Sequence, residues 1–92
     1  MSAFAPATKL INRRVRDARG EIVGRVSELL MDVDRGQIEY VLISLSSGFD
    51  GRRAEATVPW SIVRADTRNV DQWYLTVNRR ALESIARAVT RD

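Results

Sequence analysis

Cysteine and histidine are both absent from this 92-residue sequence, and the two absences remove most of the familiar reactive sites. Without cysteine there are no disulfides, thiol nucleophiles or thiolate metal sites. Without histidine the commonest general base near neutral pH and the commonest metal ligand are missing. No nucleophile motif or glycine-rich phosphate loop is present either. The sequence therefore predicts a protein that is not an enzyme and that uses no cofactor or metal.

Long hydrophobic runs are also lacking. No apolar stretch approaches the roughly 20 residues that a membrane-spanning helix needs. The N-terminus, MSAFAPATKL, has no basic stretch followed by an apolar one, so we expect no signal peptide. A chain free of cysteine fits a reducing compartment. We therefore expect a cytoplasmic protein without a membrane span.

Lysine is scarce, because fourteen of the 15 basic residues are arginines, and the net charge is +3. Arginine forms bidentate pairs with carboxylates and phosphates. A charge of this size allows weak contact with nucleic acid or an anionic surface without requiring it. The arginines are scattered singly or in pairs, which equally fits solvated strand faces with surface ion pairs.

The length predicts one domain. We expect residues 1–8 to be a flexible lead-in and residues 9–92 to form the single folded unit. A domain of this size buries only about 60–65% of its unfolded surface, so self-association would stabilise it.

Short segments rich in β-branched and aromatic residues predict a mainly β fold built around one long hairpin. Its arms are residues 22–34 and 38–47, joined by a tight turn at residues 34–37. Gly20 supplies the positive φ of an earlier turn, and Gly24 suits close backbone approach or a sharp bend. We expect the remaining strands at residues 10–17, 56–60, 62–65 and 73–77.

Two features of the hairpin carry further expectations. In its first arm the apolar alternation changes phase after Ser27, which indicates either a β-bulge or a short helical turn. In its second arm Ile38, Tyr40 and Leu42 would share one face, and Val41, Ile43 and Leu45 the other. A strand that is apolar on both faces is usually covered twice. The second cover would be a terminal helix or another copy of the chain.

A helix is expected after the last strand, with Asn78 as its N-cap. The apolar residues that follow have the spacing of one helix face, namely Leu82, Ile85, Ala86 and Val89. This face would pack on the sheet or across a dimer interface, and the nearby arginines leave open a membrane-surface role.

These segments together resemble the PRC-barrel domain family over roughly residues 9–88. The residues that carry the resemblance are Leu10-Ile11-x-Arg13-x-Val15, Gly20-Glu21-x-x-Gly24-x-Val26-x-x-Leu29, Asp32-x-Asp34-x-Gly36-x-Ile38-x-Tyr40-Val41, Val58-Pro59-Trp60 and Leu75-Thr76-Val77. The resemblance implies a small β-barrel of five or six antiparallel strands with a short C-terminal helix. It also implies a self-associating docking or assembly module without a catalytic signature.

The paired carboxylates Asp32 and Asp34 have two interpretations. They could hold a hard cation or perform acid–base chemistry. Alternatively Asp34 opens the turn and Asp32 pairs with a neighbouring arginine. Within the polar loop 46–55, the segment Asp50-Gly51-Arg52-Arg53 likewise either cradles an anion through its arginines and loop amides or is simply a mobile loop.

Aromatic residues offer a further alternative, because Tyr40, Trp60, Trp73 and Tyr74 could stack single-stranded bases. The alternation places Tyr40 and Trp60 in the core and leaves Tyr74 as the better candidate for exposure. The predicted interaction surface comprises Phe49, Asp50, Arg52, Arg53, Tyr74, Leu82 and Ile85.

The sequence therefore predicts a non-enzymatic interaction module that forms a homodimer and binds a further, unidentified protein. The alternative is an RNA- or ribosome-associated factor that contacts phosphates through Arg13, Arg14, Arg52 and Arg53.

Overall fold

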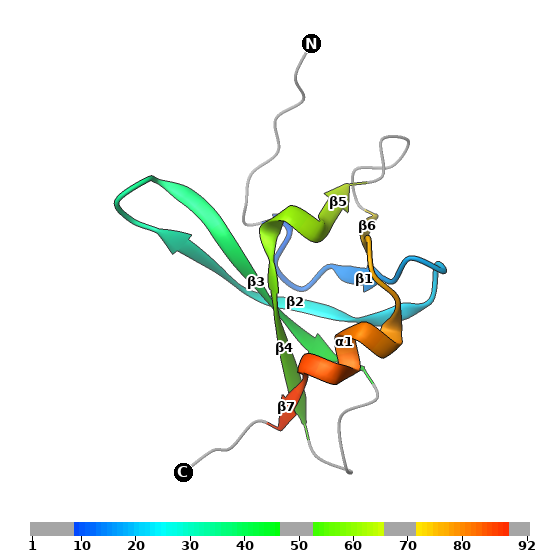
Figure 1. Cartoon of the computed structure of the whole chain (residues 1–92). Coiled ribbons are helices and arrows are strands. Elements are labelled where there is room, and N and C mark those ends of the chain that lie inside the picture. Colours follow the sequence, from blue (N-terminus) through cyan, green and yellow to red (C-terminus); the bar gives the residue numbers. More distant parts are fainter. Residues whose placement is uncertain (1–8, 47–52, 66–71, 89–92) are drawn as a thin grey trace.

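The computed structural model describes residues 9–46, 53–65 and 72–88, and these residues form one curved β-sheet with a single α-helix against it (Figure 1). The elements are β1 (Arg14–Arg16), β2 (Ile22–Asp32), β3 (Gln37–Leu45), β4 (Ala54–Pro59), the 3-10 turn η2 (Trp60–Ile62), β5 (Val63–Ala65), β6 (Trp73–Leu75), α1 (Arg79–Ile85) and β7 (Arg87–Ala88). The mainly β fold with a short C-terminal helix is thus confirmed.

The sheet is mixed and open, which corrects the expected barrel of five or six antiparallel strands. Its seven strands follow the order β5-β6-β1-β2-β3-β4-β7, so β5 and β7 are edges that do not pair with each other. β1 and β6 run parallel, whereas the other pairs are antiparallel. Strands β1, β5 and β6 have only three residues each, and Pro59, which has no N–H to donate, ends β4. The strands at the β5-β6-β1 end of the sheet are therefore too short to reach β7, and the described sheet is not closed.

The long hairpin β2–β3 is the centre of the fold, as the sequence predicts. The register between its strands shifts between Val26 and Glu28, so the change of phase at Ser27 is a β-bulge within one continuous strand. The connecting turn occupies residues 33–36, one residue earlier than expected. Gly20 and Gly36 both have positive φ, at 91° and 66°.

The core lies on one face of this hairpin. Val41, Ile43 and Leu45 are buried there; the alternation predicts that they share a face but does not identify that face as the core. Partners from β2 and β4 extend the same face, because Val26 and Ala56 both lie opposite Ile43. The buried core consists of Leu10, Val15, Val23, Val26, Val41, Ile43, Leu45, Ala54, Ala56, Val58, Val63, Leu75 and Leu82.

Several segments are shorter than predicted, most of all the first strand and the helix. The strand expected at residues 10–17 is reduced to Arg14–Arg16, because residues 10–12 form a turn in which Asn12 has φ 69°. The helix begins as expected, since the Asn78 Oδ1 accepts a hydrogen bond from the Ala81 N–H at 3.0 Å. It ends at Ile85, after which Ala86 is extended and the chain returns to the sheet as β7. No helix in the described ranges is long and apolar enough to cross a membrane.

Candidate functional site

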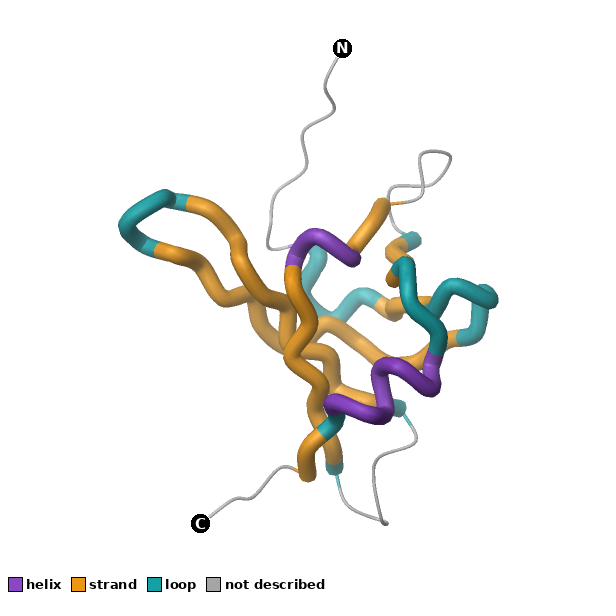
Figure 2. The backbone as a smooth tube through the Cα atoms, in the orientation of Figure 1, coloured by secondary structure: helices purple, strands orange, loops and turns teal. Residues whose placement is uncertain are grey.

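The outer end of the β2–β3 hairpin extends well beyond the rest of the sheet, as the tube view in Figure 2 shows. We call residues 28–40 the hairpin arm. The arm exposes several large apolar side chains, namely Leu30, Met31, Val33 and Tyr40. Exposed apolar groups that gather on one element commonly mark an interaction site. This element is therefore the first candidate for function.

Three apolar residues of the arm and its neighbouring strand lie in one cross-strand row. Leu30 is opposite Tyr40, and Tyr40 is opposite Pro59. Directly paired residues project from the same face of a sheet, and this face is the one away from the core. Leu42, which is half-buried, lies two residues from Tyr40 on the same face. We call Leu30, Tyr40 and Pro59 the apolar row.

The exposure of Tyr40 corrects the sequence-based expectation that this residue belongs to the core. Its side chain is 48% exposed. The alternation of apolar residues identifies the two faces of β3 but does not say how far the rest of the protein covers them. At the position of Tyr40 the outer face has no covering element among the described residues.

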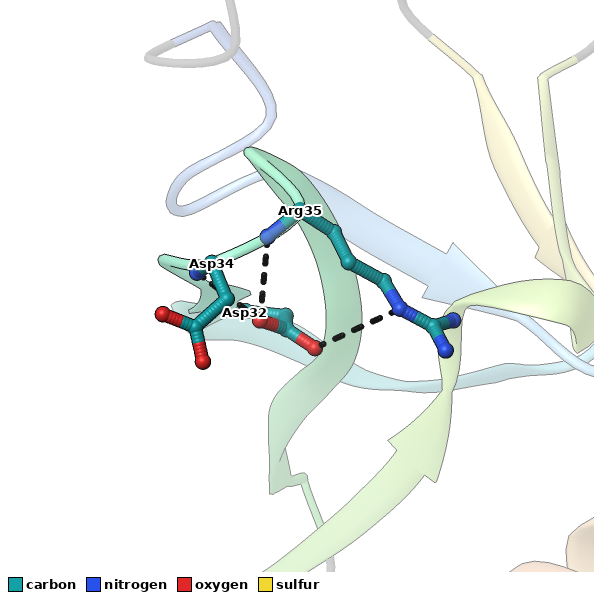
Figure 3. Close-up of polar contacts among 3 residues, drawn as sticks. All are labelled: Asp32, Asp34 and Arg35. Atoms are coloured by element: carbon teal, nitrogen blue, oxygen red, sulfur yellow. Dashed lines mark hydrogen bonds and ion pairs between the residues drawn. The ribbon is translucent and has the colours of Figure 1, made fainter.

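The carboxylate pair at the tip of the arm has a structural role (Figure 3). The Asp32 Oδ1 accepts hydrogen bonds from the backbone N–H groups of Asp34, at 3.0 Å, and Arg35, at 3.2 Å. The Asp32 Oδ2 lies 4.0 Å from the Arg35 Nε. Asp32, rather than Asp34, therefore organises the turn, and its pairing with a neighbouring arginine agrees with the turn interpretation.

In the described part of the chain, Asp32 and Asp34 are not joined by further side chains of the kind that bind metals. Within the described ranges, no three histidine, cysteine, aspartate or glutamate side chains are grouped as metal ligands would be. The acidic character of the arm is nevertheless pronounced. Between residues 28 and 40 the sequence carries four carboxylates and one arginine, namely Glu28, Asp32, Asp34, Glu39 and Arg35.

The predicted surface residues fall in different places. Phe49, Asp50 and Arg52 lie outside the described residues. Arg53 is exposed just before β4, and Tyr74 and Ile85 are exposed on β6 and α1. Leu82 is fully buried, so its side chain packs into the core and is not on the surface. The structure therefore does not gather the described members of this set into one site.

The tryptophans also have a packing role. Trp60 and Trp73 are partly buried against the core, and their ring centroids are 6.3 Å apart with an angle of 44° between the planes. Tilted aromatic pairs at this separation are favourable. Of the four aromatic residues considered for base stacking, only Tyr40 and Tyr74 are exposed.

One polar residue that the sequence analysis did not single out is fully buried. The Asp17 Oδ1 accepts hydrogen bonds from the N–H groups of Arg19, at 2.9 Å, and Glu21, at 3.0 Å, and its Oδ2 accepts one from Arg79, at 2.9 Å. Burial by itself would raise the pKa of Asp17. The three hydrogen bonds and the nearby Arg19 charge outweigh burial and lower this pKa below its ordinary value.

Asp17 thus joins the β1–β2 turn to the start of α1. Its position one residue before Ala18-Arg19-Gly20 is the usual one for an aspartate that stabilises a turn. That local signal was available in the sequence. The third bond, to a residue 62 positions away, was not.

Comparison with known families gives one match. The family model described as PRC-barrel domain matches residues 4–83. No curated protein matches the chain.

Proposed function

Because the match spans most of its length, the chain belongs to the PRC-barrel domain family, and on this premise we propose that it is a non-enzymatic interaction module that forms a homodimer. The observation that carries the proposal is the apolar row on the outer face of the hairpin. Leu30 and Tyr40 are 40% and 48% exposed. Their burial against a partner would remove apolar surface from water at about 25 cal/mol per Å².

The distribution of charge along the outer face favours a second copy of the chain as the partner. Asp32 and Asp34 lie toward the tip, and Leu30 follows in β2. Glu28, opposite Leu42, and then Arg25, opposite Ser44, lie further along the same face. The face is therefore acidic at the tip, apolar at Leu30 and Tyr40, and basic at its far end, with the one carboxylate of Glu28 before Arg25. Its two ends are complementary to each other when the face is reversed.

A two-fold dimer uses this self-complementarity. If two copies pack outer face to outer face with their arms antiparallel, the apolar rows meet at the centre. Each acidic tip then lies over Arg25 of the other copy. Interfaces related by a two-fold axis bring the same patch of both subunits together, and complementary charges at their periphery fix the register.

The polar residues of the domain support a role without catalysis. Asp17 is the one buried charged residue of the described chain, and its oxygens are already occupied by three backbone N–H groups. Asp32 is engaged in the turn. These two best-placed carboxylates therefore stabilise the fold, and the chain supplies no histidine or cysteine to act in their place.

The test is a measurement of molar mass by light scattering after size-exclusion chromatography, at tens of micromolar protein. We expect about twice the chain mass of 10.4 kDa for the wild type. The double variant Leu30→Ser, Tyr40→Ser should be a folded monomer. Ile85→Ser is the matched control, because Ile85 is 46% exposed but lies on α1. This control should remain dimeric.

Two results would overturn the proposal. One is a wild-type chain that elutes as a monomer at these concentrations. The other is a double variant that dimerises as strongly as the wild type, since the apolar row would then lie outside the interface. Circular dichroism of each variant establishes that it is folded, so that loss of dimer is not confused with unfolding.

A further inference from the structure

Three strands from distant parts of the sequence place Tyr74 between two arginines. In the β1–β6 pairing Arg16 lies opposite Tyr74, and in the β5–β6 pairing Arg64 lies opposite Tyr74. The three side chains therefore project from the same face of the sheet. The neighbouring residues Val15, Val63 and Leu75 are buried on the other face, so this row lies on the outside.

Arg14 extends the basic surface, because it is two residues from Arg16 in β1 and is exposed. We call Arg14, Arg16, Arg64 and Tyr74 the arginine–tyrosine face. Next to it is a cleft of about 220 Å³ whose described lining contains arginines and amides but no carboxylate: Asn12, Arg13, Arg14, Arg16, Arg25 and Gln72. Arg14 and Arg25 lie directly opposite each other, and like charges in this position repel.

Among the described residues, neutral acceptors orient Arg16 and Arg64 without cancelling their charge. Arg16 donates to the Gly20 carbonyl at 2.8 Å and to the Gln72 Oε1 at 3.2 Å. Arg64 donates to the carbonyls of Ser61 and Val63. Within the described ranges, Arg14, Arg16 and Arg64 form no ion pair with a carboxylate. Guanidinium ions whose described partners are neutral carbonyl and amide oxygens are suited to bind anions.

Another arginine-rich cleft among the described residues is different. Arg19, Arg79 and Arg80 line it together with Asp17, Glu21, Asn78 and Glu83. Carboxylates there offset the positive charge. Of the two described linings, the one beside β1 therefore has the larger excess of positive charge.

We infer that the arginine–tyrosine face binds single-stranded nucleic acid. Arg14, Arg16 and Arg64 would contact successive phosphates, and the ring of Tyr74, 40% exposed, would stack on a base. A positively charged surface interleaved with an exposed aromatic ring is the usual design of single-strand binding sites. Tyr74 is what favours this ligand over a membrane or duplex DNA, because unstacked bases are required to use the ring.

The site differs from the one that the arginine pairs in the sequence suggest. Of Arg13, Arg14, Arg52 and Arg53, only Arg14 belongs to the arginine–tyrosine face. Arg16 and Arg64 join it through strand register, which spacing in the sequence does not reveal. Arg25 lies between this face and the apolar row, so it is left unchanged in the test. Arg14 lies directly opposite Arg25, so the arginine–tyrosine face and the proposed dimer contact adjoin at this pair.

The experiment measures fluorescence anisotropy of labelled 12-nucleotide single strands, one RNA and one DNA of the same sequence, over a range of salt concentrations. Each neutralised phosphate of a single strand contributes about −0.7 to the slope of log affinity against log salt. Three arginines therefore predict a slope of about −2. Binding of either oligonucleotide supports the proposal, and a difference between them reports contact with the 2′-hydroxyl.

Variants separate stacking from charge. Tyr74→Ser should weaken binding roughly 5- to 150-fold with little change of slope, whereas Tyr74→Phe should bind like the wild type. Arg14→Gln with Arg64→Gln should reduce the magnitude of the slope by about 1.4. Arg19→Gln with Arg80→Gln removes the same charge from the other cleft, and this control should bind within about twofold of the wild type.

Several results would overturn the inference. Absence of binding at low salt is one. Equal loss in the two double variants would mean attraction to net charge alone. Equal affinity for duplex, for inorganic polyphosphate or for vesicles of anionic lipid, together with no effect of Tyr74→Ser, would reject single-stranded nucleic acid as the ligand.

Discussion

The carboxylate of Asp17 holds the first residue of the helix, because its Oδ2 accepts a hydrogen bond from the Arg79 N–H at 2.9 Å. Its Oδ1 simultaneously holds the β1–β2 turn. The Arg79 side chain returns to the sheet and donates to the Ile22 carbonyl at 3.0 Å. A single buried residue thus connects the β1–β2 turn to the start of α1, and its removal should affect both.

Asp17→Asn should therefore lower the free energy of unfolding by about 2–3 kcal/mol at pH 7, because an amide cannot accept all three N–H groups. The pKa of Asp17 is lower in the folded state than in the unfolded state, where aspartate titrates near 3.9. The contribution of this carboxylate to the free energy of unfolding is thus complete above about pH 4. It is lost as the pH falls through the lower pKa of the folded state. Urea unfolding at pH 7, 4 and 3 measures it.

The difference between wild type and Asp17→Asn should accordingly shrink at the most acidic pH. A difference that stays constant would show that the charge of Asp17 has no part in its role. The exposed Asp34 provides a control, since Asp34→Asn should change stability by less than about 0.5 kcal/mol.

Gly24 is the second position where one substitution should be severe. A Cβ atom there would lie 2.2 Å from the Ser44 carbonyl oxygen and 2.9 Å from the Ile43 Cγ2. The obstacle is the backbone of β3, which is held on its other side by β4, so it cannot move aside cheaply. Gly24→Ala should cost about 3 kcal/mol or more.

Gly20→Ala gives the comparison for this prediction. Gly20 has open space around it but a φ of 91°, so alanine there is strained without a clash and should cost about 1–2 kcal/mol. Chemical denaturation of both variants tests the order. A smaller loss at Gly24 than at Gly20 would mean that the β2–β3 spacing is not fixed as described.

Local rules were sufficient for several of these features. The phase change at Ser27, the turn glycines, the alternation along β3 and the cap at Asn78 all depend on residues close together in sequence, and all were predicted. The parallel pairing of β1 with β6 depends on residues nearly 60 positions apart. The arginine–tyrosine face depends on it as well, because Arg16, Arg64 and Tyr74 meet only when that register is known.

How far other elements cover each face of β3 could not be predicted from nearby residues either. The alternation in β3 correctly placed Tyr40 and Val41 on different faces. It did not predict which residues of the outer face would remain in solvent. That depends on the hairpin arm extending past the strands beside it. The helix end was missed for a similar reason, since Arg87 and Ala88 leave the helical pattern to pair with Glu55 and Ala54.

The turn at the tip of the arm permits a direct comparison of two adjacent carboxylates. Asp32→Ala removes the acceptor for two backbone N–H groups and should cost about 1 kcal/mol. Asp34→Ala should cost less than about 0.5 kcal/mol. Amide hydrogen exchange at Gly36, whose N–H bonds to the Asp32 carbonyl at 2.8 Å, should accelerate only in the first variant. Faster exchange in both variants would mean that the Asp34 side chain also stabilises the turn.

Charge reversal tests the register of the proposed dimer. In the antiparallel arrangement Arg25 of one copy faces the acidic tip of the other, so Arg25→Glu and Asp34→Arg should each weaken dimerisation, by about fivefold, the equivalent of about 1 kcal/mol. The double variant restores opposite charges across the interface and should return to within about twofold of the wild type. Analytical ultracentrifugation at low and moderate salt measures the dissociation constants, and the single-variant losses should diminish as salt screens the charges. Arg80→Glu imposes the same change of charge on the helix and should leave the dimer unaffected. If the losses of the two single variants simply add in the double variant, the two residues do not face each other, and the copies pack in another orientation.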